Sequence, residues 1–312
     1  MASSWSDAWG TVRRAFGEDS LQWLDRSYVV DWSIASIAWI VAWILSGLPP
    51  FEREFSRSDP VIDHKHRSSQ ISGELNWSIA LFVPLAVVMA TSLYRRSAVD
   101  LHHGCLALLA GRGFSEVITE FLKNRVGRLR PDFLHRCKWD KDVKSCAGDL
   151  ETVLDGRRSF PSGHSSTAFS GMMFLSLFIA GMTGAWCITH PAPARSFVAS
   201  RLARFILSLL PLVFASWVAI SRLEDNKHHK EDVIVGSLIG SACAIVCYLT
   251  YWPSPFTHGR NPSASVSASA SRSAAHAPRL VYVDHDRDSA RQQNGYDYEL
   301  AGMVHENGVE SV

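Results

Sequence analysis

Three short polar stretches of the chain carry the residue types that phosphate chemistry needs. They are Lys123 with Arg130-Pro131 after six residues, Pro161-Ser162-Gly163-His164, and Ser221-Arg222 with His228 after five residues and Asp232 after three more. Lysine and arginine bind the non-bridging oxygens of a phosphate, and backbone N–H groups stabilise developing charge. One histidine can attack phosphorus while a second protonates the leaving group. Together the three stretches predict a phosphoryl-transfer site.

The first stretch stands where a helix is expected to end. Lys123 and Arg130 are seven residues apart, which is two helical turns, so both side chains point the same way if the helix persists through Gly127. Pro131 then ends the helix, because it lacks the N–H that a helix interior needs. We therefore expect two cations on one helix face.

The other two stretches predict an anion site and an oriented nucleophile. Ser162 directly precedes a long apolar run, so it is a good helix N-cap, and the exposed N–H groups of Gly163 and His164 would then bind an anion. His228 and Asp232 are four residues apart, which is one helical turn. The carboxylate can therefore accept a hydrogen bond from one imidazole nitrogen and leave the other free as a nucleophile.

The sequence does not favour a metal cofactor. It has no paired carboxylates or His-x-x-x-His set of the kind that holds Mg²⁺ or Zn²⁺, and no glycine-rich loop ending in Lys-Ser. His228, His229 and Asp232 are an alternative ligand set, but adjacent histidines on a helix point in different directions. We expect no metal and no cofactor.

Apolar runs separate these stretches. Five runs without any Asp, Glu, Lys or Arg match the thickness of a bilayer, at residues 32–49, 77–94, 165–189, 205–221 and 233–257. A sixth candidate, at 101–122, is interrupted by Arg112, Glu116 and Glu120. The pattern predicts an all-α polytopic membrane protein with six transmembrane helices. Buried helices of a large soluble protein are the alternative, but such helices are usually shorter and amphipathic.

Six alternating helices would bring the polar stretches together. The first stretch follows the third helix, the second precedes the fourth, and the third connects the fifth to the sixth, so all three reach the same face of the membrane. Lysine and arginine occur in the loops of both faces, so their count alone does not fix the orientation. Inside the third helix, Arg112 is expected to pair with Glu116 one turn away, with a role in lipid headgroup entry as the alternative.

The average composition of the 312 residues conceals the division into apolar runs and polar stretches. The chain is 47% hydrophobic and 20% charged, with a net charge of +1 and a mean hydropathy close to zero. These values exclude a disordered chain, a collagen and a small disulfide scaffold, and the balanced charge argues against a nucleic-acid partner.

Both ends differ from the apolar middle. We expect a cytosolic N-terminal segment at 1–28 without a cleavable signal, a six-helix membrane domain at 29–252, and a disordered cytosolic tail at 253–312, since the tail is too polar to form a core. The tail is solvated filler or regulatory. Cys137 and Cys146 share one loop and could form a disulfide if that loop faces an oxidising lumen.

The three stretches resemble the signature of the type 2 phosphatidic acid phosphatase superfamily, K-x6-R-P, P-S-G-H and S-R-x5-H-x3-D, with every fixed position present. The resemblance extends from about Pro49 to Gly240, includes the segment 127–133, and is strongest to the fungal diacylglycerol pyrophosphate phosphatases. It implies activity without Mg²⁺ and an active site on the luminal or extracellular face of a six-helix core. It also implies residue roles: His228 attacks phosphorus and forms a phosphohistidine, Asp232 orients it, His164 protonates the leaving oxygen, and the phosphate is bound by Lys123, Arg130, Ser162, Gly163 and Arg222.

The function implied is hydrolysis of lipid phosphates such as diacylglycerol pyrophosphate, phosphatidate and lysophosphatidate, with membrane lipids as further partners. We expect a multi-pass protein of the vacuole, endoplasmic reticulum, Golgi or plasma membrane. Polyprenyl or sphingoid-base phosphates, and transfer of the phosphoryl group to an alcohol, remain alternatives with the same chemistry. A transporter or scaffold is a third alternative, but transporters typically show repeated halves and broken helices, and no repeat appears. The oligomeric state is left open.

Overall fold

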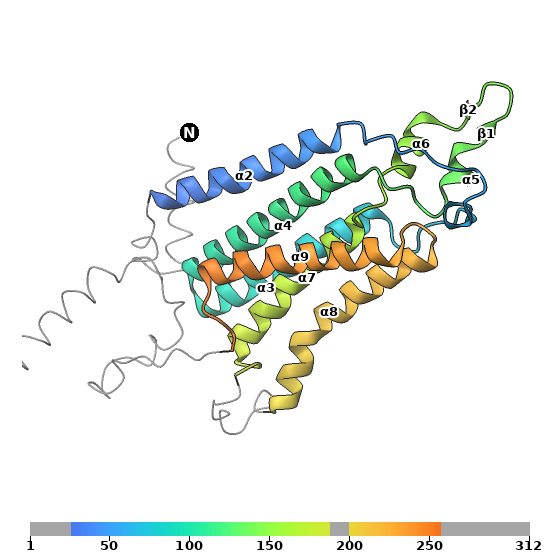
Figure 1. Cartoon of the computed structure of the whole chain (residues 1–312). Helices are drawn as coiled ribbons and strands as arrows, with labels where there is room; N and C mark the ends of the chain where they lie inside the picture. Colours follow the sequence, from blue (N-terminus) through green and yellow to red (C-terminus); the bar gives the residue numbers. More distant parts are fainter. Residues whose placement is uncertain (1–25, 188–199, 257–312) are drawn as a thin grey trace, which may run out of the picture. The chain divides into compact units, whose positions relative to one another are not determined.

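The computed structural model describes residues 26–187 and 200–256 (Figure 1). The long helices of this part are α2 (Ser27–Ser46), α3 (Gly73–Arg95), α4 (Ala98–Val126), α7 (Gly163–Thr183), α8 (Arg201–Glu224) and α9 (Lys230–Tyr251). The short elements are η1 (Pro60–Ile62), α5 (Phe133–Cys137), β1 (Trp139–Asp140), β2 (Ser145–Cys146) and α6 (Leu150–Gly156). β1 and β2 form one small antiparallel pair. The predicted all-α fold is confirmed.

Five of the long helices, α2, α3, α7, α8 and α9, are long and apolar enough to cross a membrane. Large apolar side chains on them face outward, with Trp43 76%, Val213 63% and Leu238 63% exposed. An exposed apolar surface of this kind suits lipid rather than water. The chain is therefore a multi-pass membrane protein.

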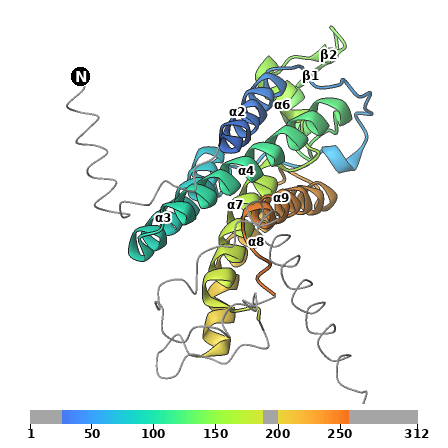
Figure 2. The ribbon, with the colours of Figure 1, turned by 90° about the vertical axis from the view of Figure 1, so that its left-hand side faces the viewer.

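The α4 helix is long enough to cross a membrane but is not apolar enough, because charged residues interrupt it. It packs against α2, α3, α7 and α9, and Figures 1 and 2 show it among these neighbours. Polar side chains on such a helix face protein instead of lipid, so their cost in a membrane is reduced. A sixth span at α4 stays a prediction.

The helix interfaces explain how the bundle holds together. Leu81 and Val88 of α3, Leu108 of α4, Phe178 of α7 and Tyr248 of α9 belong to one buried apolar cluster. Small residues allow the closest approaches: a Cβ on Gly236 of α9 would lie 2.5 Å from the carbonyl oxygen of Ser162. The α9 helix therefore packs directly against the start of α7, where the second polar stretch lies.

The ends of several helices differ from the expected ones. α2 ends at Ser46, three residues before Pro49, and α9 ends at Tyr251 rather than at residue 257. α4 is longer than the expected 101–122 at both ends. Ser97 caps its start by accepting a hydrogen bond from Asp100 N at 3.2 Å, and Gly127 is the C-cap at its end. The predicted N-terminal segment and tail lie almost wholly outside the described residues.

Loops 47–72, 127–162 and 225–229 meet at one end of the helices, where α5, β1, β2 and α6 also gather (Figure 1). Hydrogen bonds connect them. Phe51 N donates to Asn124 O at 2.8 Å, and Gln70 N donates to Asp225 Oδ2 at 3.0 Å. All three polar stretches therefore reach the same end, as the alternation of the helices predicts.

Candidate active site

The helix that carries Lys123 does not continue to Arg130. α4 ends at Val126, and Gly127 adopts a left-handed conformation with φ of +56°. A side chain at Gly127 would collide with the carbonyl oxygen of Phe51, so the chain turns where only glycine fits. The expected continuous helix face is thus wrong, because a glycine C-cap ends the helix before Pro131 can.

Arg130 is instead held in place by its loop. Leu129 is buried in a small apolar cluster with Phe133, and Arg130 N donates to Gly156 O at 2.8 Å. The Arg130 guanidinium donates to Asp155 twice, from Nε to the carbonyl oxygen at 3.0 Å and from Nη2 to Oδ1 at 2.7 Å. These contacts leave the remaining N–H groups of Arg130 for an anion.

A disulfide supports the same loop. Cys137 and Cys146 are bonded, with their Cα atoms 4.6 Å apart, and Cys137 is fully buried in the apolar cluster of Leu129. Its neighbour Arg136 donates from Nη1 to Asp155 Oδ2 at 2.8 Å, so Arg136 and Arg130 share one carboxylate. The disulfide is therefore one residue away from Arg136, which binds the same carboxylate that fixes Arg130.

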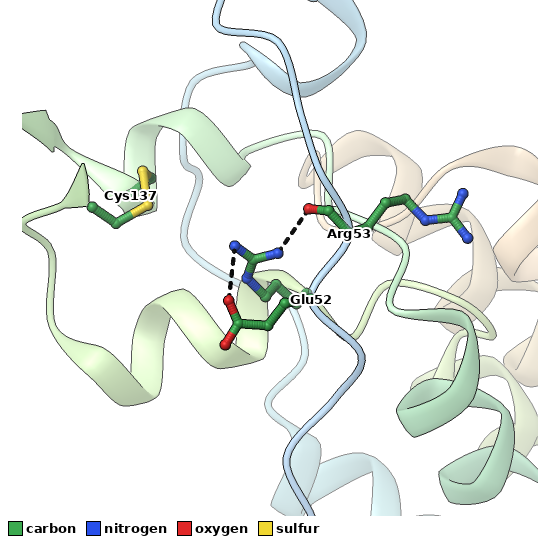
Figure 3. Close-up of a disulfide and its surroundings, with 5 residues drawn as sticks. Glu52, Arg53 and Cys137 are labelled. Atoms are coloured by element: carbon green, nitrogen blue, oxygen red, sulfur yellow. Dashed lines mark hydrogen bonds and ion pairs between the residues drawn. A yellow bond between two sulfur atoms is a disulfide. The ribbon is translucent and has the colours of Figure 1, made fainter. Parts of the chain in front are cut away.

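The loop between α4 and α7 also packs against the segment that follows α2. Arg157 donates from Nη1 to the carbonyl oxygen of Arg53 at 3.0 Å and forms an ion pair with Glu52 (Figure 3). Figure 3 shows these contacts beside Cys137. The loop between α4 and α7 is thus fixed on two sides.

Removing the disulfide by the double substitution Cys137→Ala and Cys146→Ala is expected to cost about 2–3 kcal/mol of stability, the amount for a loop of this length. It should also raise KM several-fold, because Arg136 and Asp155 would hold Arg130 less firmly. Thermal unfolding and steady-state kinetics in detergent test both effects. Cys243→Ala, at a free cysteine of α9, is the matched control. An unchanged melting temperature in the double variant would contradict the expectation.

The second stretch begins α7 as predicted. Ser162 is the N-cap, and its side chain accepts a hydrogen bond from Ser165 N. A Cβ on Gly163 would lie 2.8 Å from Lys123 Nζ, so the lysine ammonium is next to the first residue of the helix. His164 Nε2 is buried without a hydrogen-bond partner among the described residues. A ring nitrogen left without a partner at this position can serve an incoming ligand.

His228 precedes α9 instead of lying within it, because the helix begins at Lys230. Its Nδ1 lies 2.8 Å from the carbonyl oxygen of Ser159, so Nδ1 carries the proton. Burial and the charge of Arg130 lower the pKa of His228 to about 4. The imidazole is therefore neutral near pH 7, with a free lone pair on Nε2.

The expected hydrogen bond from His228 to Asp232 is not formed. The two side chains approach only to 3.9 Å, between Nδ1 and Oδ2, because the ring turns toward Ser159. Asp232 instead accepts from Ser159 Oγ at 2.6 Å and from Arg128 Nη1 at 2.7 Å. It also accepts from His229 N at 3.0 Å, which caps α9. Asp232 therefore lies close to His228 without a hydrogen bond to the ring.

The sequence alone missed two participants. Arg128 had a signal, since it lies in the segment 127–133 that carries part of the family resemblance. Ser159 had none, because a single serine three residues before Ser162 is unremarkable. Its position depends on the hydrogen bond from Ser159 N to Arg128 O at 3.0 Å, which joins two separate segments of the loop between α4 and α7.

The three stretches converge on one site. Arg222 is buried and forms an ion pair with Asp225 at 3.1 Å, and Lys123 forms one with Glu120 at 2.6 Å. Arg222, Arg130 and Lys123 all interact electrostatically with the His164 ring. Ser162 N donates to Asp232 O at 2.9 Å, which joins the second stretch to the third. Every predicted site residue thus lies in or directly beside one cationic site that contains two histidines.

Arg112 forms no direct ion pair with Glu116, although the two charges still interact at longer range. Its Nη1 donates to Trp77 O at 3.3 Å, and its guanidinium lies 5.3 Å from the centroid of the Trp77 ring and 5.9 Å from that of Trp39. The expected ion pair is therefore wrong. Two aromatic faces from α2 and α3 stabilise the cation within the bundle instead.

Among residues 26–187 and 200–256, no group of three metal-ligating side chains is placed to hold a metal ion. Activity without Mg²⁺ stays a prediction.

Comparisons with known proteins agree with the site. Residues 104–255 match the model of the PAP2 superfamily. Lipid phosphate phosphatase 2 of Arabidopsis thaliana is 34% identical, over 74% of this chain and 79% of its own. Probable diacylglycerol pyrophosphate phosphatase 1 of Schizosaccharomyces pombe is 34% identical, over 67% and 75%. Diacylglycerol pyrophosphate phosphatase 1 of Saccharomyces cerevisiae is 31% identical, over 71% and 80%. No solved structure matches the chain significantly.

The bundle and the convergent cationic site define a multi-pass membrane phosphatase. The chain belongs to the PAP2 superfamily.

Proposed function

We propose that this membrane phosphatase hydrolyses lipid phosphates, namely diacylglycerol pyrophosphate, phosphatidate and lysophosphatidate, through a phosphohistidine on His228. The observation that carries the proposal is the neutral, buried His228 in a site with Lys123, Arg130 and Arg222. The names of the relatives, which are phosphatases of lipid phosphates and of diacylglycerol pyrophosphate, support the substrate class.

In the first step, the lone pair of His228 Nε2 attacks phosphorus. The N–P bond forms while the P–O bond to the lipid breaks. His164 enters this step as an imidazolium, having taken the acidic proton of the substrate phosphate, and gives that proton to the leaving oxygen. The three cations and the N–H groups at Gly163 and His164 stabilise the charge on the phosphoryl oxygens. The protonated leaving group is the lipid alcohol or, for a pyrophosphate, the lipid monophosphate.

In the second step, a water molecule attacks the phosphohistidine. His164 accepts a proton from this water, the N–P bond breaks, and its electron pair returns to His228 Nε2. Inorganic phosphate leaves, and both histidines regain their starting states. Atoms and charge balance without a further reactant, and the chelator experiment below tests whether a metal ion takes part.

We place the active site on the luminal or extracellular face of an endomembrane or of the plasma membrane. The bond between Cys137 and Cys146 supports this orientation, since disulfides persist in oxidising compartments. The site lies beyond the ends of apolar helices, at the depth expected for a lipid headgroup. A lipid can then keep its acyl chains in the membrane while its phosphate reaches His228.

A panel of lipid phosphates tests the proposal. Detergent-purified protein with a chelator present should release inorganic phosphate from diacylglycerol pyrophosphate, phosphatidate and lysophosphatidate. Sphingoid-base and polyprenyl phosphates, and added alcohols as phosphoryl acceptors, are the comparison arms. Exclusive turnover of a comparison substrate, transfer to an alcohol instead of water, or dependence on added Mg²⁺ would contradict the proposed reaction.

A further inference from the structure

Ser159 lies between the two residues that the proposed reaction needs to act together. Its backbone carbonyl oxygen accepts the hydrogen bond of His228 Nδ1 at 2.8 Å, and its hydroxyl donates to Asp232 Oδ2 at 2.6 Å. The side chain of Ser159 is fully buried. One residue thus contacts the imidazole through its main chain and the carboxylate through its side chain.

The surroundings of Asp232 show why this bridge is needed. At 3.9 Å from His228 Nδ1, its carboxylate is too distant for a hydrogen bond to the ring. Arg128 holds the other oxygen, Oδ1, at 2.7 Å, and Ser159 and His229 hold Oδ2. The carboxylate is therefore fixed close to the Ser159 carbonyl oxygen, which accepts the hydrogen bond of the imidazole.

We propose that Ser159 is a positioning residue that couples the Asp232 carboxylate to the His228 imidazole while the phosphohistidine forms. The inference rests on the proposed function. When Nε2 bonds to phosphorus, the ring keeps its Nδ1 proton and becomes positively charged. The hydrogen bond to Ser159 O then strengthens, and the nearby negative charge of Asp232 stabilises the ring. The Ser159 hydroxyl keeps that charge in place before the reaction starts.

The substitution Ser159→Ala removes the hydroxyl and leaves the backbone carbonyl. We expect kcat to fall about 10- to 100-fold, the range for losing a hydrogen bond to a charged group. KM should change little, because Ser159 is not expected to touch the substrate. Ser176→Ala is the matched control, since Ser176 is an equally buried serine whose hydroxyl donates to Ser208 O at 2.6 Å within the bundle. It should keep the kcat of the parent protein.

A double-mutant cycle with Asp232→Asn separates coupling from a merely structural role. In the Asp232→Asn background, adding Ser159→Ala should lower kcat by less than about threefold, because the charge that Ser159 positions is already absent. A serine that only supports the fold would cause the same loss in both backgrounds. Equal losses, or a Ser159→Ala variant within twofold of the parent kcat, would overturn the proposal.

Ser159→Cys keeps the test decisive if the alanine variant does not fold. A thiol fills nearly the same space but is a weak hydrogen-bond donor. Its kcat should therefore fall while its melting temperature stays near that of the parent, and full activity would refute the coupling. Failure of the proposed function is distinguishable, because it would appear in the parent protein as turnover without a labelled phosphohistidine.

Discussion

Replacing His228 with asparagine is expected to lower kcat for a lipid phosphate by about 10⁴-fold or more, the scale seen when a catalytic nucleophile is removed. Asparagine keeps a polar group in the buried space but has no basic nitrogen that can attack phosphorus. The loss should fall on kcat, because Lys123, Arg130 and Arg222 still bind the phosphate. Release of inorganic phosphate by detergent-purified protein, with a chelator present, measures the effect.

His64→Asn is the matched control for this experiment. His64 lies on the same face of the bundle, where its backbone N–H donates to the carbonyl oxygen of Pro131 at 2.9 Å, but its side chain is exposed. The substitution keeps that main-chain contact. It should retain the parent rate. A His228→Asn variant that keeps more than about one tenth of the parent rate would show that another residue attacks phosphorus.

Replacing His164 with asparagine is expected to lower kcat for phosphatidate and lysophosphatidate by about 10²- to 10⁴-fold, the range for losing a general acid. The lipid alkoxide is a poor leaving group, so it needs the proton that His164 supplies. The phenolate of an aryl phosphate such as p-nitrophenyl phosphate leaves without protonation, so kcat for that substrate should fall far less. Comparing the two substrate types on one variant measures the role of the proton.

This leaving-group comparison separates chemistry from structure. His164 also accepts a hydrogen bond at its carbonyl oxygen from Asn76 Nδ2 at 3.0 Å, which connects α7 to α3. That contact uses the main chain, so the asparagine variant keeps it. Equal losses for the lipid and the aryl substrate would show that His164 supports the site and does not protonate the leaving group.

The long helices and the meeting of the three polar stretches follow from the sequence. Uncharged runs of membrane length mark the helices. Strict alternation places the C-terminal ends of α4 and α8 and the N-terminal end of α7 on one face. Ser162 was identifiable as an N-cap because its signal is local. Residue type and spacing were therefore sufficient wherever one helix and its ends determine the position.

The finer geometry depends on contacts between distant segments. The turn at Gly127 is required by the carbonyl of Phe51, which approaches from a loop about 75 residues away in the chain. His228 turns away from Asp232 because the carbonyl of Ser159 is a nearer acceptor. Arg112 finds two tryptophans on neighbouring helices. None of these partners is visible from helical spacing within one segment.

Trapping the covalent intermediate tests the central claim most directly. Purified protein is mixed with lipid substrate carrying a ³²P label on its terminal phosphate, quenched with alkali within milliseconds, and digested. The account predicts alkali-stable, acid-labile label on the peptide that contains His228, formed with a chelator present and absent from the His228→Asn variant. Phosphate release without any labelled intermediate, or label on another residue, would contradict it.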